Sequence, residues 1–377
     1  MKNSVKQHAS ALTAVLACLA LALVLYHSLA GGTLLQSSPY NSYALQAENW
    51  LAGRNNIANG ENYTWLELAI YQGRYYQSFP PVPAVLMLPF VAAAGEWSAI
   101  PGNLIAMGLA LLCAGGVYAC CMRGGMQPVT CAFFTLFVSM GSNVFWMSTS
   151  DGVWFLAQVC ALGFAFWGLF FAQGGNAVQD AAASLCMALA VGCRPFYALL
   201  LACWLGWQFY QRRSLKRILP ALLPAVVMAA CMMAYNFARF GSVTEFGHNY
   251  LPEFVRAENG QFSLTYLVPN LLQLLRPVTL DAQGQLHFEI YNGFLFFCCQ
   301  PAFPAGDGTR TVAALARAPG GSAGQCSTAI GGVVCCGDVP VNDLPDLYAP
   351  HIGRLAVWRT VYGRSFPVAV CMVPGVP

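Results

Sequence analysis

The chain has 377 residues, of which 57% are hydrophobic and only 9% are charged, and its mean hydropathy is +0.54. Because an ordinary soluble domain carries charge on roughly a quarter of its residues, this composition predicts an all-α fold, a polytopic transmembrane helical bundle. The formal net charge of +3 is small and its basic residues are dispersed, which excludes a nucleic-acid partner. Membrane lipid is the first partner that we expect.

The 16 cysteines form no recognisable metal or disulfide pattern. Those up to Cys231 lie inside apolar runs, where we interpret them as small helix-packing residues. No Cys-x-x-Cys pair and no Cys/His cluster with zinc-type spacing occurs. The sequence therefore predicts no cofactor, and it leaves the redox compartment and a divalent metal open.

Apolar runs of membrane length recur along residues 1–237. The first, over 9–29, is long for a signal-peptide core and further runs follow, so an uncleaved span is favoured over a secretory signal cleaved near Ala30. The other expected spans cover 80–97, 101–121, 128–147, 152–172, 182–210 and 217–236. This makes about seven spans, with 30–79 as an external loop.

Lysine and arginine residues indicate the orientation. With these spans, the N-terminus with its two lysines falls on the same face as the basic stretch 211–217, and the positive-inside rule makes that face cytoplasmic. The loop 30–79 and everything after Phe237 are then external, and Arg123 is an exception to the rule. We expect an integral membrane protein with a cytoplasmic N-terminus.

The expected span over 182–210 is interrupted by "GCRPF" at 192–196. Pro195 removes a helix hydrogen bond, and Arg194 places a charge near mid-membrane, where such a residue faces the bundle interior or a water-filled cavity. The alternative is that two shorter helices meet here and Arg194 extends to an interface.

Two external segments contain expected amphipathic interfacial helices. The first covers 41–53, with Gly53 as its stop; its apolar face consists of Tyr43, Ala47, Trp50 and Leu51. The second covers 262–275 within the external segment 238–300. We interpret both as lying on the membrane surface.

The tail 301–377 is rich in Gly, Pro and Cys and contains no membrane-length apolar run. A separate soluble domain is one interpretation. For residues 356–367, synonymous codons exist that, read one base later, encode a sequence typical of membrane enzymes. Our hypothesis is a frameshift near residue 300.

Three stretches together resemble a known family: "WLELAIYQGRYYQSFPPVPAVLMLP" at 65–89, "GCRPF" at 192–196 and "YNFARFGSVTEFGHNYLPEF" at 235–254. They are similar to bacterial multispanning glycosyltransferases of the GT-C superfamily, relatives of protein O-mannosyltransferases and of the lipid A aminoarabinose transferase. The resemblance covers about residues 10–300. It implies a bacterial cytoplasmic membrane and transfer of a sugar, with inversion, from a polyprenyl-phosphate donor to an external glycan, lipid or protein acceptor.

This chemistry requires a carboxylate that takes the proton of the acceptor hydroxyl. The family usually places an acid in the first external loop, whereas "SSPYNSY" at 37–43 contains none. The remaining candidates are Glu48, Glu61 and Glu67. Glu67 is favoured because it lies in a segment that carries the resemblance, and Glu48 is second; the alternative is that each is a solvated loop carboxylate.

The departing lipid phosphate requires cations. We expect Arg74, Arg239 and His248 to hold it, and we expect Tyr75 and Tyr76 to contact substrate at the membrane surface. The alternative for Arg239 is a helix anchor in the headgroup layer, and for His248 an ordinary surface histidine.

Asp151 is cytoplasmic on the expected topology, where it would be a residue of a helix N-terminus. It becomes a catalytic candidate if that topology is wrong by one span. No DxD triplet and no GxxxxGK[ST] loop occurs. A transporter or flippase, and a non-catalytic membrane protein, remain the alternatives to a glycosyltransferase.

Overall fold

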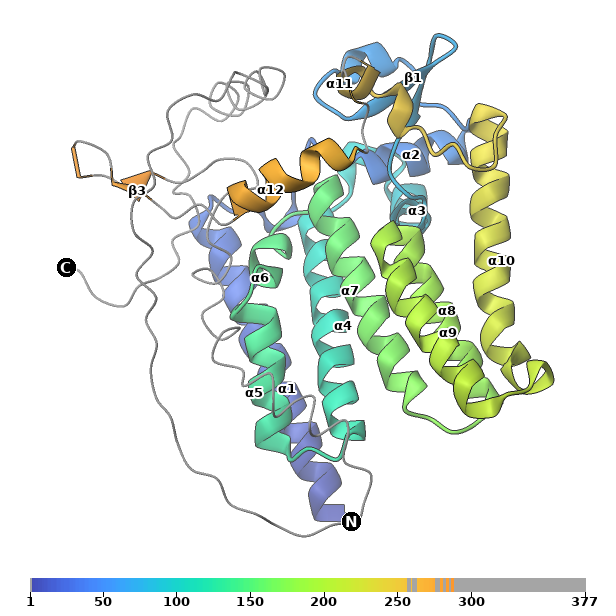
Figure 1. Cartoon of the computed structure of the whole chain (residues 1–377). Helices are drawn as coiled ribbons and strands as arrows, with labels where there is room; N and C mark the ends of the chain where they lie inside the picture. Colours follow the sequence, from blue (N-terminus) through green and yellow to red (C-terminus); the bar gives the residue numbers. More distant parts are fainter. Residues whose placement is uncertain are drawn as a thin grey trace. The chain divides into compact units, whose positions relative to one another are not determined.

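The computed structural model describes residues 2–255, 259, 263–274, 279–280, 283–284 and 286–287. The chain divides into one unit over Met1–Gln261 and another over Phe262–Pro377. The described part is mostly helical (Figure 1). Among the described residues, four helical segments are long and apolar enough to cross a membrane: Ser4–Leu29, Gly102–Arg123, Val153–Ala172 and Ile218–Phe240. The expected tail 301–377, with its frameshift hypothesis, lies outside the described residues.

The first unit is built around a bundle of helices that pack side by side (Figure 1). Its members are α1 (Lys2–Leu29), α4 (Gly102–Arg123), α5 (Pro128–Met140) with α6 (Val144–Met147), α7 (Val153–Ala172), α8 (Ala177–Cys193), α9 (Ala198–Arg212) and α10 (Leu215–Phe240). Helix α7 packs between α4 and α8, and α10 packs on α8. Small residues permit the close approach: Gly163 faces Cys113 of α4, and Gly168 faces Met187 of α8.

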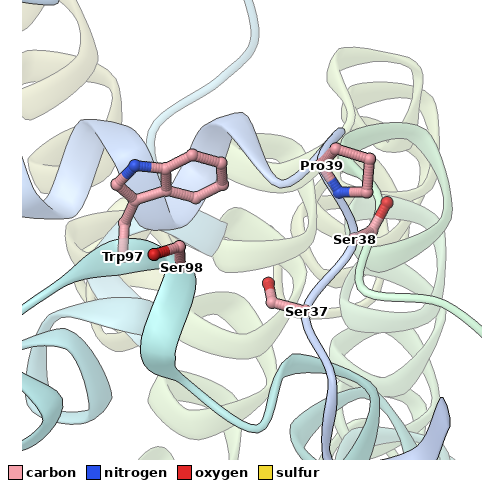
Figure 2. A pocket seen from close by; sticks show the side chains of 5 residues that line it. All are labelled: Ser37, Ser38, Pro39, Trp97 and Ser98. Carbon is pink, nitrogen blue, oxygen red and sulfur yellow. The ribbon is translucent and has the colours of Figure 1, made fainter.

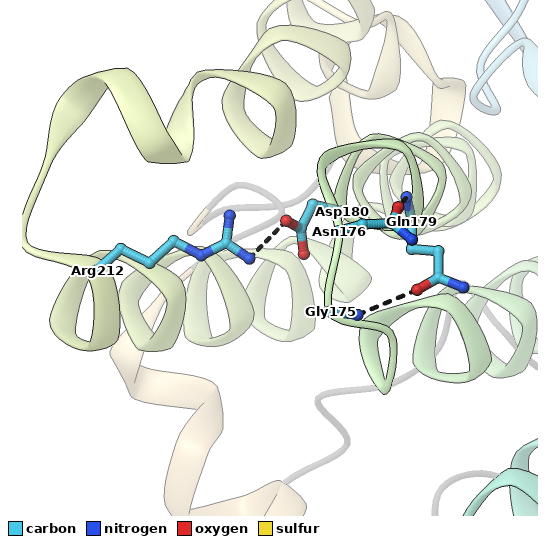
Figure 3. A network of polar contacts seen from close by, with 5 residues as sticks. All are labelled: Gly175, Asn176, Gln179, Asp180 and Arg212. Atoms are coloured by element: carbon cyan, nitrogen blue, oxygen red, sulfur yellow. Dashed lines mark hydrogen bonds and ion pairs between the residues drawn. The ribbon is translucent and has the colours of Figure 1, made fainter.

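Long-range contacts place several helix termini at one end of this bundle. His8 near the start of α1 contacts Tyr118 near the end of α4, and Gln173 after α7 donates to Cys120 of α4. Asp180 near the start of α8 forms an ion pair with Arg212 at the end of α9, at 2.5 Å (Figure 3). We call this the basic end, because Lys6, Arg123, Arg212 and Arg213 lie there.

Helices α8 and α9 are an antiparallel hairpin, as the Asp180–Arg212 pair requires. Figure 3 also shows the cap that begins α8: Asn176 accepts from the Gln179 backbone N–H at 3.0 Å, and the Gln179 side chain accepts from Gly175 at 3.1 Å. The expected span over 182–210 is therefore two helices, joined by the 3-10 turn Pro195–Tyr197. Arg194 is extended because a residue before proline avoids the helical region. The structure confirms that two helices meet here, and the extension of Arg194 to an interface stays a prediction.

The opposite end of the bundle holds the long connections, and we call it the loop end. It contains residues 30–79, 95–101, 148–152, 194–197 and 241–255. In this part of the chain lie α2 (Ser42–Leu51), β1 (Leu68–Tyr71), β2 (Arg74–Gln77), α11 (Pro252–Val255) and the 3-10 turns Thr33–Leu35, Gly60–Tyr63, Trp97–Ala99 and His248–Tyr250. The two strands form an antiparallel hairpin in which Leu68 pairs with Gln77.

Helix α3 (Val82–Ala94) corrects the expected topology, because it does not cross the bundle. Val82 at its start meets Gly192 near the end of α8, while Trp97 after it borders Ser37; both sites belong to the loop end. Its 13 residues span roughly 20 Å, short of the roughly 30 Å apolar core of a bilayer. It packs on α2 instead.

This difference moves the connections between α3 and α8 to the other side, whereas the split of 182–210 into α8 and α9 leaves 211–217 and the segment after Phe237 where they were expected. Arg123 now lies at the basic end with the other cations, so it is no longer an exception to the charge rule. Asp151 lies at the loop end, with 30–79.

Helix α2 falls within the predicted range 41–53, and Asn41 caps it by accepting from the Ala44 backbone N–H at 2.9 Å. Its predicted place on the membrane surface is corrected. Tyr43 and Ala47 are fully buried in a cluster with α3 and α7, and the polar Gln46 is also fully buried. Tyr43 and Ala47 of the predicted apolar face therefore contact protein, whereas Leu51 at the end of the helix is exposed.

The second unit has described elements in 3-10 turn Leu264–Tyr266, helix α12 (Leu267–Leu274) and the strands β3 (Thr279–Leu280) and β4 (Leu286–His287). The apolar residues of this helical segment are exposed: Leu264, Leu267, Val268, Leu271 and Leu272. This is compatible with the interfacial helix expected over 262–275.

Candidate functional site

Asp151, just before α7, forms hydrogen bonds with the stretch 37–43, in which the expected acid is missing. It is fully buried, and its carboxylate accepts from Ser37 Oγ at 2.6 Å, Ser38 N at 2.7 Å and Asn41 Nδ2 at 2.7 Å. Its own backbone N–H donates to Asn103 Oδ1 at 3.2 Å. Burial raises the pKa of Asp151 and outweighs these hydrogen bonds, which act in the opposite direction. The carboxylate that sequence reasoning found missing near Ser38 thus reaches this loop from a residue more than a hundred positions away.

Arg239, near the end of α10, is a buried cation. It is only 4% exposed, and it donates from Nη1 to the Gln77 carbonyl at 2.5 Å and from Nη2 to Asn236 Oδ1 at 3.1 Å. Its guanidinium carbon lies 3.9 Å from the ring centre of Tyr235. Among the described residues no carboxylate lies within ion-pair distance, and the carboxylate of Glu245 instead accepts from Gly247 and Asn249. Its burial excludes the simple headgroup anchor.

Arg194 lies between α8 and α9, close to the same segment. Its Nη2 donates to the Trp154 carbonyl at 2.8 Å, and its guanidinium carbon lies 5.7 Å from the ring centre of Phe79. Because Arg239 binds Gln77, two residues before Phe79, the parts of this segment that the two arginines touch are at most about 7 Å apart along the backbone. Within the described residues, Arg194 also has no carboxylate at ion-pair distance.

Several buried polar atoms of the loop end have no hydrogen-bond partner in the described part of the chain. They are Ser42 Oγ, Tyr43 Oη, both side-chain polar atoms of Gln46 and of Gln77, Tyr235 Oη, and the Nε atoms of Arg194 and Arg239. Burial raises the pKa of Tyr43 well above its usual range; the charge of Arg194 opposes this, and Tyr235 adds to it, so these groups are neighbours. Buried polar groups are normally satisfied by protein, water or ligand, so this cluster is suited to a polar, anionic ligand.

Glu67 is the predicted acid that lies closest to this arginine cluster in the hydrogen-bond network. Its Oε2 accepts from Trp154 Nε1 at 3.2 Å, and the carbonyl of the same Trp154 accepts from Arg194. Its backbone carbonyl accepts from Ser78 Oγ at 2.9 Å. The structure thus brings Glu67 and Arg194 to the two sides of one tryptophan.

Glu48, the second predicted acid, lies elsewhere. Burial raises its pKa and the nearby Glu96 carboxylate adds to this, while the backbone N–H of Trp97 and the charge of Arg54 act in the opposite direction. Trp97 also borders a pocket of about 200 Å³, lined by Ser37, Ser38, Pro39, Trp97 and Ser98 (Figure 2). Glu48 is therefore associated with this pocket and not with the arginine cluster.

Four other predicted residues, Arg74, Glu61, Tyr75 and Tyr76, lie in surface segments or in packing contacts of the loop end. Arg74 and Glu61 are exposed in surface segments. Tyr75 packs on Gly60 and Ile57 of its own loop, and the Tyr76 ring lies 5.2 Å from that of Phe240. The two tyrosines therefore pack the hairpin onto the protein.

His248 packs among aromatic rings, 6.1 Å from Phe79 and 5.1 Å from Phe246. Burial lowers the pKa of His248; Arg194 lowers it further, whereas Glu253 and Glu245 raise it. The lowered pKa disfavours the charged form of the imidazole that the predicted phosphate contact requires.

Sequence reasoning missed Tyr43, Gln46, Gln77 and Tyr235 as parts of the site. A signal for Gln46 existed, because it falls three residues after Tyr43 and four before Trp50, on the apolar face of a predicted helix. No group of three or more His, Cys, Asp and Glu side chains in the described part could hold a metal ion. Comparisons with family models, curated proteins and solved structures found no match to this chain. The fold and composition define a mostly helical protein with candidate membrane spans.

Proposed function

We propose that this chain is an integral-membrane glycosyltransferase that moves a sugar, with inversion, from a polyprenyl-phosphate donor to an acceptor. The observation that carries the proposal is the pair of half-buried and buried arginines, Arg194 and Arg239, with no carboxylate partner among the described residues. A buried cation is costly unless it is paired, and a phosphate oxyanion would pair with it. Both arginines lie at the end of apolar helices, where a lipid-linked phosphate would arrive.

The proposed step is a single displacement. Glu67 takes the proton of the acceptor hydroxyl, whose oxygen forms a bond to the anomeric carbon. The bond between that carbon and the phosphate oxygen breaks, and polyprenyl phosphate leaves with the electron pair. Arg194 and Arg239 stabilise the charge that develops on the leaving phosphate. Glu67 is preferred over Glu48 because Trp154 links it to Arg194.

The orientation belongs to the same proposal. The loop end faces the outside and the basic end faces the cytoplasm, because all four basic residues named above lie at the latter. The interrupted helix supports an enzyme over a transporter: the break at Arg194 and Pro195 lies at the loop end, whereas transporters place broken helices near mid-membrane.

A transfer assay tests the proposal. The full chain in membranes is incubated with radiolabelled polyprenyl-phosphate sugars, beside Glu67→Gln, Glu48→Gln and Arg239→Gln. We expect label transfer that Glu67→Gln and Arg239→Gln each reduce by roughly 100-fold or more, as expected when a general base or a charge-stabilising group is removed. Absence of transfer with every donor from a well-folded chain would contradict the proposal, and movement of the intact lipid across the bilayer would support a flippase.

A further inference from the structure

The pocket beside Trp97 belongs to no role assigned above. It is formed where the chain enters α2, by Ser37, Ser38 and Pro39, and where it leaves α3, by Trp97 and Ser98 (Figure 2). Its volume of about 200 Å³ has room for one small ring. None of the five residues that line it is charged.

One wall of this pocket is aromatic and rigidly held. The Tyr63 ring packs edge-on at 6.1 Å from Trp97 and at 5.8 Å from Trp65. The indole N–H of Trp65 donates to the Pro39 carbonyl at 3.0 Å, which fixes the neighbouring wall. A partly exposed indole held in this way offers a flat apolar surface next to polar groups, which suits the C–H face of a sugar ring.

The other walls offer both donors and acceptors. Ser37 donates its proton to Asp151, so its oxygen remains able to accept. Ser38 Oγ accepts from the Tyr40 backbone N–H at 3.2 Å, so its own proton remains available. The carboxylates of Glu48 and Glu96 lie beside Trp97 and Ser98 as further acceptors. Sugar hydroxyls both donate and accept, so they match this mixture.

We propose that this pocket binds one neutral sugar ring, as part of a glycan acceptor. The role as an acceptor site rests on the proposed glycosyltransferase function, whereas the binding of the sugar does not. The proposal assigns Trp97 as the stacking surface and the three serines as hydroxyl partners.

Direct binding tests it. The full chain is purified in a detergent whose headgroup is not a sugar, since a maltoside would compete. Equilibrium dialysis then measures binding of radiolabelled glucose, galactose, mannose and N-acetylglucosamine to the wild type, Trp97→Ala and Ser98→Gln. Trp207→Ala is the matched control, because Trp207 is exposed on α9.

We expect at least one sugar to bind saturably, and both pocket variants to weaken it by about tenfold while the control does not. If Trp97→Ala fails to fold, Ser98→Gln decides, because Ser98 is exposed and its enlargement blocks the pocket without burying a polar group. The inference is overturned if no sugar saturates or if the folded pocket variants bind like the wild type. Sugar binding without transfer would overturn only the proposed function, and transfer that is insensitive to Ser98→Gln would overturn only the pocket.

Discussion

At the level of single residues, the fold buries charged side chains at the loop end. The carboxylate of Asp151 contacts the loop in which an acid was expected and not found. Arg239 is buried against the Gln77 carbonyl of the β1–β2 hairpin. The chemistry of Arg239 was predictable from its residue type and its position at a span end. Its burial was not, because it depends on Gln77, 162 positions away in the sequence.

The Asp151→Asn variant tests the buried carboxylate. In either orientation the amide NH₂ faces a donor, the Ser38 N–H or the Asn41 side-chain NH₂. We expect the free energy of unfolding to fall by about 1–3 kcal/mol, measured by thermal unfolding in detergent. Unchanged stability would show that these hydrogen bonds do not form.

The stability difference between wild type and Asp151→Asn should depend on pH. Because burial raises the pKa of Asp151, the folded protein binds more protons than the unfolded chain at pH values above the usual range of an aspartate. The contribution of this group to stability therefore falls as the pH rises through its folded-state pKa. The penalty of Asp151→Asn relative to wild type should be largest in acid and smaller at neutral pH; a penalty that grows with pH would contradict the direction of the shift.

At the scale of elements, two features of the sequence concealed the arrangement. Helix α3 is as apolar as a true span, so hydropathy could not distinguish a helix that packs on α2 from one that crosses. The break in the α8–α9 hairpin was visible, since proline removes a donor and restricts the preceding residue. The bounds of α2 were predictable from its cap and glycine stop, but its buried surroundings depend on tertiary packing.

The start of α4 must lie close to Asp151, and glycine makes this possible. A Cβ on Gly102 would overlap the Asp151 carboxylate and Ser37 Oγ, whereas a Cβ on Gly108 in the same helix would meet nothing. We expect Gly102→Ala to destabilise the protein by about 1–3 kcal/mol through overpacking. Gly108→Ala should be neutral or stabilising by up to about 1 kcal/mol, since alanine favours helix. Equal melting temperatures for the two variants would contradict this contact.

The α8–α9 hairpin depends on its ion pair. Asp180 is 1% exposed, so Arg212→Ala leaves a buried carboxylate without its cation. We expect a loss of about 3 kcal/mol in unfolding free energy. Arg213→Ala is the matched control and should cost less than about 1 kcal/mol, because Arg213 is exposed. The proposal for this hairpin fails if both variants melt alike.

At the scale of the whole molecule, one short helix decides which residues share a side. With α3 on one side only, the 30–79 loop, Asp151 and both arginines belong to the loop end, and Arg123 joins the other basic residues. The number of spans is the same whether α3 crosses and 182–210 is one span, or α3 does not cross and α8 and α9 are two. The sequence alone therefore could not determine on which side each connection lies. With α3 at one end of the bundle, Arg123 is no longer an exception to the charge rule, which favours this order of spans.

We infer that the loop end and the basic end lie on opposite faces of the membrane and that α3 does not cross it. Protease sites inserted after Gln72 and after Gln127 in the full chain test this in sealed, right-side-out vesicles, with detergent-opened vesicles as the control. In sealed vesicles we expect cleavage at the site after Gln72 and protection of the site after Gln127. In detergent-opened vesicles we expect cleavage at both sites. Cleavage of both sites in sealed vesicles would mean that α3 crosses, and it would contradict the common site of Asp151, Arg194 and Arg239.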